Sequence, residues 1–287
     1  MQKITKAVIA VAGSGTRFLP ATKSQPKEML PIVDKPIIQY VVEEMVNSGI
    51  KDIILVTRWD KKTLEDHFDR NFELEDSLEK SKKFEKLAEM KKISDMANFI
   101  YIRQKGPYGN GTPALCAKSI LGDEPFIYAF GDDLVKSKIP FTKQLITSYE
   151  KNPGVIFGVQ KVPKKDVVKY GIAKIKKGTK NEVETIIEKP SISEAPSQLA
   201  DFGRFVIVPE ILNILEKQTL GKGNELWLID AIEKYIRNGG KAYVQEVENG
   251  KWFTTGDPLN YLQTTVEYAL DRKDLAKDFK KYLKQII

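Results

Sequence analysis

Short apolar runs alternate with helical patterns up to about residue 160 of the chain. A repeated strand–helix order is typical of a mostly parallel sheet that is covered by helices on both faces. We therefore predict an α/β fold with a Rossmann-like, mostly parallel but mixed sheet. The predicted strands are residues 4–12, 53–57, 99–103, 126–130 and 155–159, and the helices between the first four strands are 36–48, 61–97 and 112–121.

After residue 160 the pattern becomes more mixed. Residues 171–177 and 182–188 flank a turn that contains Gly178, and this arrangement predicts a β-hairpin. No repeat, low-complexity tract or flexible linker divides the chain, so we predict a main domain over residues 1–220 and a C-terminal extension, 221–287, continuous with it. Further predicted strands are 201–208 and 241–248, further helices are 209–218 and 226–238, and two charged helices follow from about Asp257.

The segment 12–31 reads AGSGTRFLPATKSQPKEMLP and follows the first apolar run. Gly13 and Gly15 allow a sharp turn and a close approach of the backbone to a ligand. Successive N–H groups in such a turn form a concavity that binds anions. Three cations lie in the same segment, so it predicts a site for a polyphosphate: they are Arg17, Lys23 and Lys27.

The length of this loop separates it from the common phosphate-binding motifs. No Gly-Lys-Ser/Thr follows as in a Walker loop, and the third glycine of the dinucleotide fingerprint is missing. The next helical pattern begins only near Pro36, whereas loops between a strand and a helix usually run roughly two to six residues. Long ordered loops in compact domains are usually functional, which favours a ligand site over an ordinary turn.

Composition excludes several other classes of protein. The formal charge of +7 comes from basic residues spread along the chain, which suits small phosphorylated anions better than nucleic acid. The single cysteine, Cys116, excludes an internal disulfide, and its apolar surroundings predict a packed core thiol. No apolar stretch is long enough for a membrane span, and the first apolar run is too short for a secretion signal. We expect a cytoplasmic protein with no nucleic-acid or membrane partner.

Residues 61–98 are dense in Lys and Glu, with apolar residues at loose helical intervals. The pattern favours a solvated helical pair with a thin apolar stripe, and a lid or a subunit contact is the alternative. The only histidine, His67, lies here among acidic residues and is predicted to be a surface histidine.

Charged residues also follow other predicted strands. Asp132 and Asp133 come directly after the strand 126–130, so they fall at the same sheet edge as the glycine loop if the two strands are parallel neighbours. Glu188 and Lys189 end the predicted hairpin. Each pair has a simpler interpretation, as turn or cap residues for the aspartates and as an exposed ion pair for the other two.

The pattern Gly-x-Gly-Thr-Arg-x-Leu-Pro-x-Thr-Lys-x-x-Pro-Lys-Glu-Met-Leu-Pro, which starts at Gly13, resembles the signature of the sugar-nucleotide pyrophosphorylases. In particular it resembles the bacterial UTP–glucose-1-phosphate uridylyltransferases, also called UDP-glucose pyrophosphorylases. The resemblance covers nearly the whole chain in collinear order. It extends through residues 71–75, 103–104, 131–133, 188–190, 203–205 and 230–232.

The resemblance implies a reaction and a set of roles. UTP and glucose 1-phosphate would give UDP-glucose and pyrophosphate with the help of Mg²⁺, in a homodimer or homotetramer. Arg17 would meet the β- and γ-phosphates, and Lys27 would stabilise charge at the α-phosphate and the departing pyrophosphate. Asp132 would bind the metal ion. The nucleotide would also contact Ala12, Gly13, Gly15, Glu28, Gln104 and Gly109, and the sugar 1-phosphate would contact Gly171, Glu188 and Lys189.

Such a reaction needs no histidine or cysteine nucleophile, because the phosphate oxygen of a sugar 1-phosphate is already an anion. Two anions about 4 Å apart repel by roughly 4 kcal/mol at an effective dielectric constant near 20, so positioning and charge neutralisation should dominate the rate. Two alternatives stay open. One is the same chemistry with another base or sugar, such as thymidylyl transfer, and the other is a nucleotide-sugar sensor without catalysis.

The chain departs from the family pattern at two places. Thr254 stands where many relatives have an aspartate that is a second metal ligand, and the sensor hypothesis rests on this change. Either Asp132, substrate oxygens and water hold the metal ion, or Asp257 reaches in; we favour the first, since Asp257 precedes Pro258 and predicts a helix N-terminus. The second departure is Gly-Asn-Gly-Thr-Pro at 109–113, where relatives usually have Gly-Leu-Gly-His-Ala.

Overall fold

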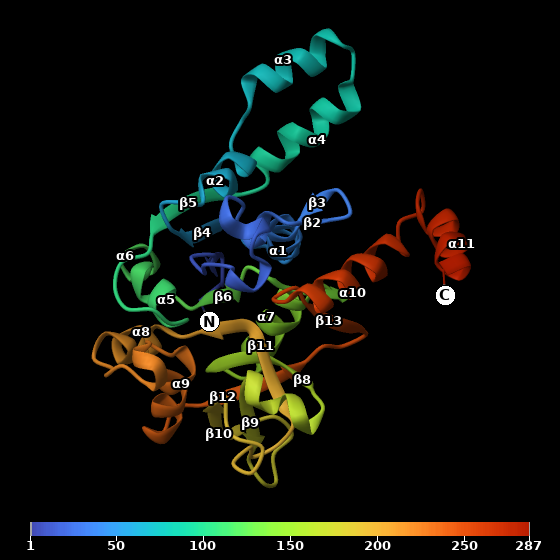
Figure 1. Cartoon of the computed structure of the whole chain (residues 1–287). Coiled ribbons are helices and arrows are strands. Elements are labelled where there is room, and N and C mark those ends of the chain that lie inside the picture. Colours follow the sequence, from blue (N-terminus) through green and yellow to red (C-terminus); the bar gives the residue numbers. More distant parts are fainter. Residues whose placement is uncertain (1, 287) are drawn as a thin grey trace.

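The computed structural model describes residues 2–286 and contains a central sheet of nine strands (Figure 1). Seven strands follow one another in the order β10-β9-β11-β6-β1-β4-β5, while β8 pairs with β11 and β12 pairs with β8. The strands are β1 (Lys6–Ala10), β4 (Asp52–Thr57), β5 (Asn98–Arg103), β6 (Phe126–Phe130), β8 (Val155–Lys161), β9 (Gly171–Ile175), β10 (Val183–Glu188), β11 (Leu199–Ile207) and β12 (Ala242–Glu246).

The mostly parallel, mixed sheet expected from the sequence is confirmed. β1 pairs in parallel with both β4 and β6, and β4 pairs in parallel with β5. β11 runs antiparallel to its three neighbours β6, β8 and β9. The hairpin predicted around Gly178 is present as the antiparallel pair β9 and β10.

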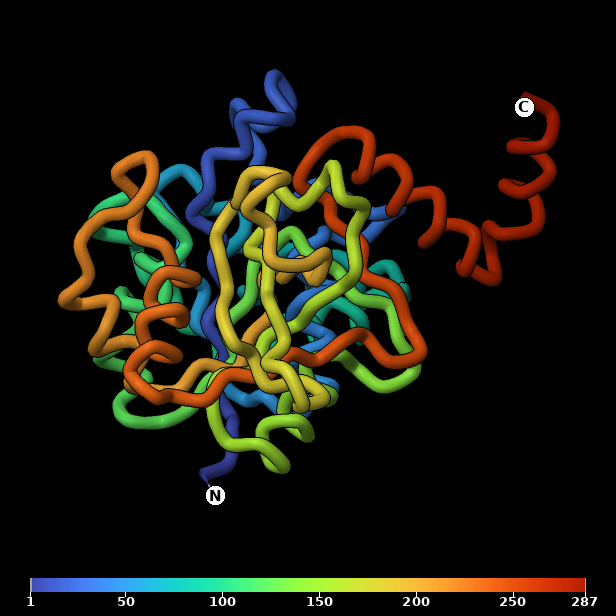
Figure 2. Tube along the Cα trace, turned by 90° about the horizontal axis from the view of Figure 1, so that it is seen from below, coloured from blue at the N-terminus to red at the C-terminus, as the bar shows by residue number. Residues whose placement is uncertain are grey.

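Helices cover both faces of the sheet, since consecutive residues of β4 and β6 are buried whichever face they point to. Helix α8 contacts both α5 and α9 in one group, and α1 contacts α7 in another; the first group lies at the left of Figure 2. The helices are α1 (Ile37–Val46), α2 (Lys62–Phe68), α3 (Phe72–Lys80), α4 (Phe84–Asp95), α5 (Thr112–Cys116), α6 (Lys118–Leu121), α7 (Phe141–Lys151), α8 (Pro209–Glu216), α9 (Leu228–Arg237), α10 (Pro258–Ala269) and α11 (Ala276–Ile286).

Two parts of the chain depart from the main body of the fold. The charged stretch predicted as one helical pair forms α2, α3 and α4, and the last two project together away from the sheet with mostly exposed side chains (Figure 1). At the other end of the chain α11 extends beyond the body and has no buried residue (Figure 2). Within residues 2–286 no helix is long and apolar enough to cross a membrane.

Several elements were absent from the sequence prediction. α7 follows Pro140, and its apolar residues recur at helical spacing from Phe141 to Tyr149, so this signal was present but was not used. β7 and β13 form a separate antiparallel pair, which joins chain segments more than 100 residues apart and therefore leaves no local signature. The remaining short strands are β2 (Pro31–Ile32) and β3 (Lys35–Pro36), and the separate pair is β7 (Asp133–Ser137) with β13 (Gly250–Thr254).

Two predictions about single residues are wrong. His67 is half-buried rather than a surface residue, because its Nε2 atom lies 3.0 Å from Oε1 of Gln39 on α1 and its ring packs edge-on against Phe68. Cys116 is only partly buried rather than a packed core thiol, and its Sγ atom lies 3.3 Å from the carbonyl oxygen of Lys105.

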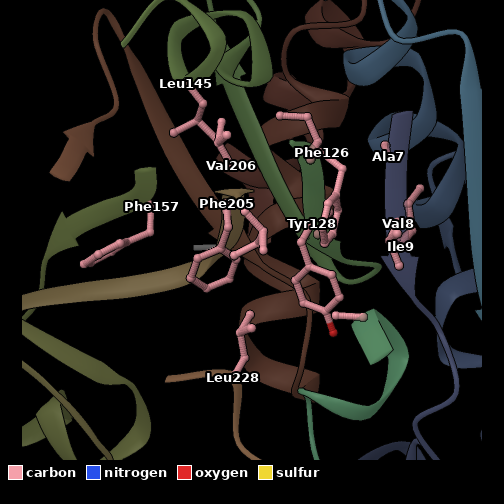
Figure 3. Packing of buried hydrophobic residues seen from close by; sticks show 14 of the residues in the cluster. Ala7, Val8, Ile9, Phe126, Tyr128, Leu145, Phe157, Phe205, Val206 and Leu228 are labelled. Atoms are coloured by element: carbon pink, nitrogen blue, oxygen red, sulfur yellow. The ribbon is translucent and has the colours of Figure 1, made fainter. Parts of the chain in front are cut away.

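The apolar core continues from the parallel strands into β11 (Figure 3). Tyr128 and Phe205 are fully buried with ring centroids 6.1 Å apart, and Phe157 lies 6.3 Å from Phe205 on the far side. Burial of each such side chain stabilises the fold by roughly 1.5–3 kcal/mol. Because β11 pairs with both β6 and β9, this core connects the parallel strands to the hairpin.

A glycine in β11 allows the strand to bulge against this core. Gly203 has φ +71°, and a Cβ atom at this position would lie 2.0 Å from Cδ2 of Phe130. We expect Gly203→Ala to lower the free energy of unfolding by about 2–4 kcal/mol, because the left-handed backbone strain adds to overpacking. Denaturant unfolding measures this loss.

Gly178→Ala is the matched control for that variant. Gly178 also has a positive φ, +84°, but a Cβ atom there would meet nothing within 4 Å. Gly178→Ala should lower the free energy of unfolding by only about 1 kcal/mol. Equal losses for the two variants would show that the contact with Phe130 contributes nothing.

Candidate active site

The glycine loop and the two aspartates meet at one edge of the sheet, as expected. Ala10 at the end of β1 is paired with Phe130 at the end of β6, and the Gly131 N–H donates to the Ala10 carbonyl oxygen at 3.3 Å. Both segments therefore leave the sheet side by side at the carboxyl ends of parallel strands, where ligands bind in α/β folds.

A cavity of about 430 Å³ opens at this edge and continues to the hairpin β9–β10. Most of the residues predicted for the site line it. Gly15 is the exception: it has φ +67°, and its carbonyl oxygen accepts a hydrogen bond from Thr22 Oγ1 at 2.7 Å, so it shapes the loop behind the cavity. The predicted residues that line the cavity are Ala12, Gly13, Arg17, Lys27, Glu28, Gln104, Gly109, Asp132, Gly171, Glu188 and Lys189.

The cations of the loop differ in how firmly they are held. The Lys27 ammonium forms an ion pair with Oδ2 of Asp132. Burial by itself would lower the pKa of Lys27, but the carboxylates of Asp132 and Glu28 outweigh it and raise this pKa. Arg17 is exposed, and its Nη1 atom donates to the carbonyl oxygen of Gly256 at 3.2 Å. The loop thus presents one half-buried, ion-paired cation and one exposed cation.

The carboxylates near these cations differ in their contacts. No group of three or more His, Cys, Asp or Glu side chains able to hold a metal ion occurs among residues 2–286. Lys27 engages one oxygen of Asp132, and the Asp132 side chain lines the cavity. Asp133 instead accepts a hydrogen bond from Trp252 Nε1 at 2.8 Å, while burial and the Asp132 carboxylate raise its pKa to about 8. Of these two neighbouring aspartates, Asp132 is therefore the one whose carboxylate is charged and lies beside the loop cation, and charged carboxylate oxygens are the ligands that hard cations prefer.

The Thr254 region supports the first of the two arrangements considered for the metal ion. Thr254 lines the cavity, and its Oγ1 atom accepts a hydrogen bond from the Gly256 N–H at 3.3 Å. Asp257 caps α10 by accepting from the Asn260 N–H at 3.0 Å, as predicted, and it does not line the cavity. A carboxylate committed to a helix N-terminus is a poor second metal ligand.

One residue that lines the cavity, Glu28, belongs to a buried ion pair that was not predicted. Glu28 is fully buried, and its Oε2 atom lies 2.7 Å from Nζ of Lys61, which is itself buried at the start of α2. The other oxygen, Oε1, is buried without a hydrogen-bond partner in the part of the chain that is described. Lys61 thus holds the Glu28 carboxylate in place while one acceptor stays free beside the cavity.

The changed side chains Asn110 and Thr112 fasten the loop 109–113, and Asn110 also lines the cavity. Asn110 Oδ1 accepts from the Leu228 N–H at 2.8 Å, and Thr112 Oγ1 donates to the Pro107 carbonyl oxygen at 2.8 Å. The backbone of this loop also pairs with Leu226, whose N–H donates to Tyr108 and whose carbonyl oxygen accepts from Gly111. These bonds bring the segment before α9 across the cavity.

The opposite end is formed by the hairpin and β11. Lys189 has its Nζ atom 3.6 Å from Oε1 of Glu188 and 4.1 Å from the ring centroid of Trp227. Burial raises the pKa of Glu188. Asp201 of β11 lines the same end and is also buried. Trp227 and Asp201 were not predicted as site residues. Asp201 could have been identified from the sequence, because an aspartate in an otherwise apolar strand is unusual.

An α/β fold with a glycine-rich loop and paired charges around a cavity at the carboxyl ends of parallel strands is typical of nucleotide-binding proteins. The chain belongs to the nucleotidyl transferase family, whose model matches residues 6–270.

The chain is 46% identical to the UTP–glucose-1-phosphate uridylyltransferase of Staphylococcus epidermidis, over 100% of this chain and 99% of that protein. Among solved structures it is similar to the UTP-bound UGPase from Acinetobacter baumannii, with a TM-score of 0.89 and 38% identity over 99% of this chain and 100% of the other. It is also similar to a UDP-glucose pyrophosphorylase complexed with UDP-glucose, with a TM-score of 0.83 and 35% identity over 94% of this chain and 100% of the other.

Proposed function

We propose that the chain transfers the uridylyl group of UTP to α-D-glucose 1-phosphate, giving UDP-glucose and pyrophosphate. The observation that carries this proposal is the single cavity with Lys27 and Asp132 at one end and Glu188 and Lys189 at the other. Relatives that act on these compounds match the chain from end to end, which supports the choice of base and sugar.

The reaction is an in-line displacement at the α-phosphorus. An oxygen of glucose 1-phosphate forms the new bond to the α-phosphorus while the bond to the β-phosphate oxygen breaks, and the electron pair leaves with pyrophosphate. No proton must be removed from the nucleophile. Lys189 would hold the sugar phosphate, Lys27 would stabilise charge on the α-phosphate and the departing pyrophosphate, and Arg17 would meet the β- and γ-phosphates.

We propose Mg²⁺ as the metal ion and Asp132 as its ligand from the chain. The donor set fits, because Asp132 lines the cavity beside Lys27, and magnesium is often bound through one or two carboxylates together with substrate phosphates and water. When bound, Mg²⁺ would neutralise part of the triphosphate charge.

The test is pyrophosphate release by the purified chain with Mg²⁺. We expect release with UTP and glucose 1-phosphate together and none with either alone. A clear preference for dTTP would replace the uridylyl assignment by thymidylyl transfer. Binding of UDP-glucose without pyrophosphate release would support the sensor hypothesis, which Thr254 favours.

The cytoplasmic location and the homodimer or homotetramer expected from the sequence are part of the same proposal. Light scattering coupled to size-exclusion chromatography distinguishes the two oligomers.

A further inference from the structure

Asp201 is a buried acid that the proposed mechanism does not use. Its side chain lies in β11, is only 6% exposed, and lines the cavity at the end formed by the hairpin. Within residues 2–286 it has no Lys, Arg or His partner in an ion pair. A buried carboxylate without a cation is strongly destabilising, so such a group persists where it has another use.

The contacts of Asp201 place its carboxyl group against a residue of the predicted sugar site. Oδ1 accepts a hydrogen bond from the Gly203 N–H at 3.2 Å. Oδ2 packs directly on Gly171, since a Cβ atom there would lie 2.3 Å from it. Only a glycine leaves room for this carboxyl group at the start of β9. Oδ1 is therefore held by the backbone of β11, while Oδ2 lies against Gly171, a residue of the predicted sugar site that also lines the cavity.

The charges around Asp201 favour its neutral form. Burial and the Glu188 carboxylate raise its pKa well above the usual range, and Asp133 adds to this effect. The two backbone N–H groups at Gly203 and Gly171 oppose the shift only in part. A protonated carboxyl group can both donate and accept a hydrogen bond, which suits a sugar hydroxyl better than a phosphate.

We propose that Asp201 is a specificity-determining residue that hydrogen-bonds one hydroxyl group of the hexose 1-phosphate. This inference rests on the proposed function and deepens it. The site then selects a hexose that carries that hydroxyl group, because a deoxy sugar leaves the buried carboxyl group unpaired.

The experiment compares the wild-type chain with Asp201→Val and Asp201→Asn on glucose 1-phosphate and on each of its monodeoxy analogues, with UTP as the donor. For glucose 1-phosphate we expect kcat/KM of Asp201→Val to fall by about 10-fold or more while KM for UTP is unchanged. Asp201→Asn, which also donates and accepts, should stay within about threefold of the wild type. One deoxy analogue should be converted equally well by the wild type and by Asp201→Val, and that analogue identifies the hydroxyl group.

A purely structural role gives a different result. If Asp201 only secures the bulge at Gly203, Asp201→Val lowers the thermal midpoint and reduces conversion of all sugars by the same factor, and the inference is overturned. Equal activity of the valine variant and the wild type on glucose 1-phosphate also overturns it. A wild-type chain that converts no hexose 1-phosphate overturns the proposed function as well, so the two failures are distinguishable.

Discussion

Lys27→Ala should lower kcat by about a thousandfold while the chain stays folded. Lys27 is the one loop cation that Asp132 holds in a fixed position beside the cavity. A preorganised positive charge that meets the transferring phosphoryl group is typically responsible for a factor of about 10²–10⁵ in rate. Steady-state pyrophosphate release measures the effect, and circular dichroism with a thermal scan checks the fold.

Lys51→Ala is a suitable control, because Lys51 is exposed and lies outside the cavity. Its kcat should match that of the wild type. Near-normal turnover of Lys27→Ala would remove Lys27 from its proposed role. If Lys27→Ala does not fold, Lys27→Met provides the same test. It removes the same positive charge but keeps an apolar side chain of similar length.

Lys61→Met should lower the free energy of unfolding by about 3–5 kcal/mol. The Lys61 and Glu28 side chains are 4% and 1% exposed, and their charges pair at 2.7 Å. Burial lowers the pKa of Lys61, and the Glu28 carboxylate only partly offsets this. Removing one partner leaves the other charge buried and unpaired, which strongly destabilises the folded state. Urea unfolding with linear extrapolation measures the loss.

A double-mutant cycle isolates the pair itself. Glu28→Gln removes the second charge with little change in shape, so Lys61→Met combined with Glu28→Gln should recover much of the loss. Lys62→Met is the matched single control, since Lys62 is the exposed neighbour on α2 and should change stability by less than about 0.5 kcal/mol. Additive losses in the double variant would contradict the coupling.

Much of the fold was visible in local patterns. Alternating apolar runs predicted the parallel strands, and the turn at Gly178 predicted the hairpin, because periodicity and turn residues act over a few neighbours. The placement of the glycine loop beside Asp132 also followed from spacing, since both come directly after strands that end at one sheet edge. The individual roles of the site residues remain predictions.

Other features depend on segments that are far apart in the chain. The separate pair β7–β13 and the ion pair of Glu28 with Lys61 exist only after distant residues meet, and neither leaves a local period. His67 and Cys116 were misplaced for the same reason, because burial is set by what packs on top of a residue. Apolar periodicity and turn chemistry are thus readable along the chain, whereas the partner of each buried charge, Asp201 included, is settled by packing in three dimensions.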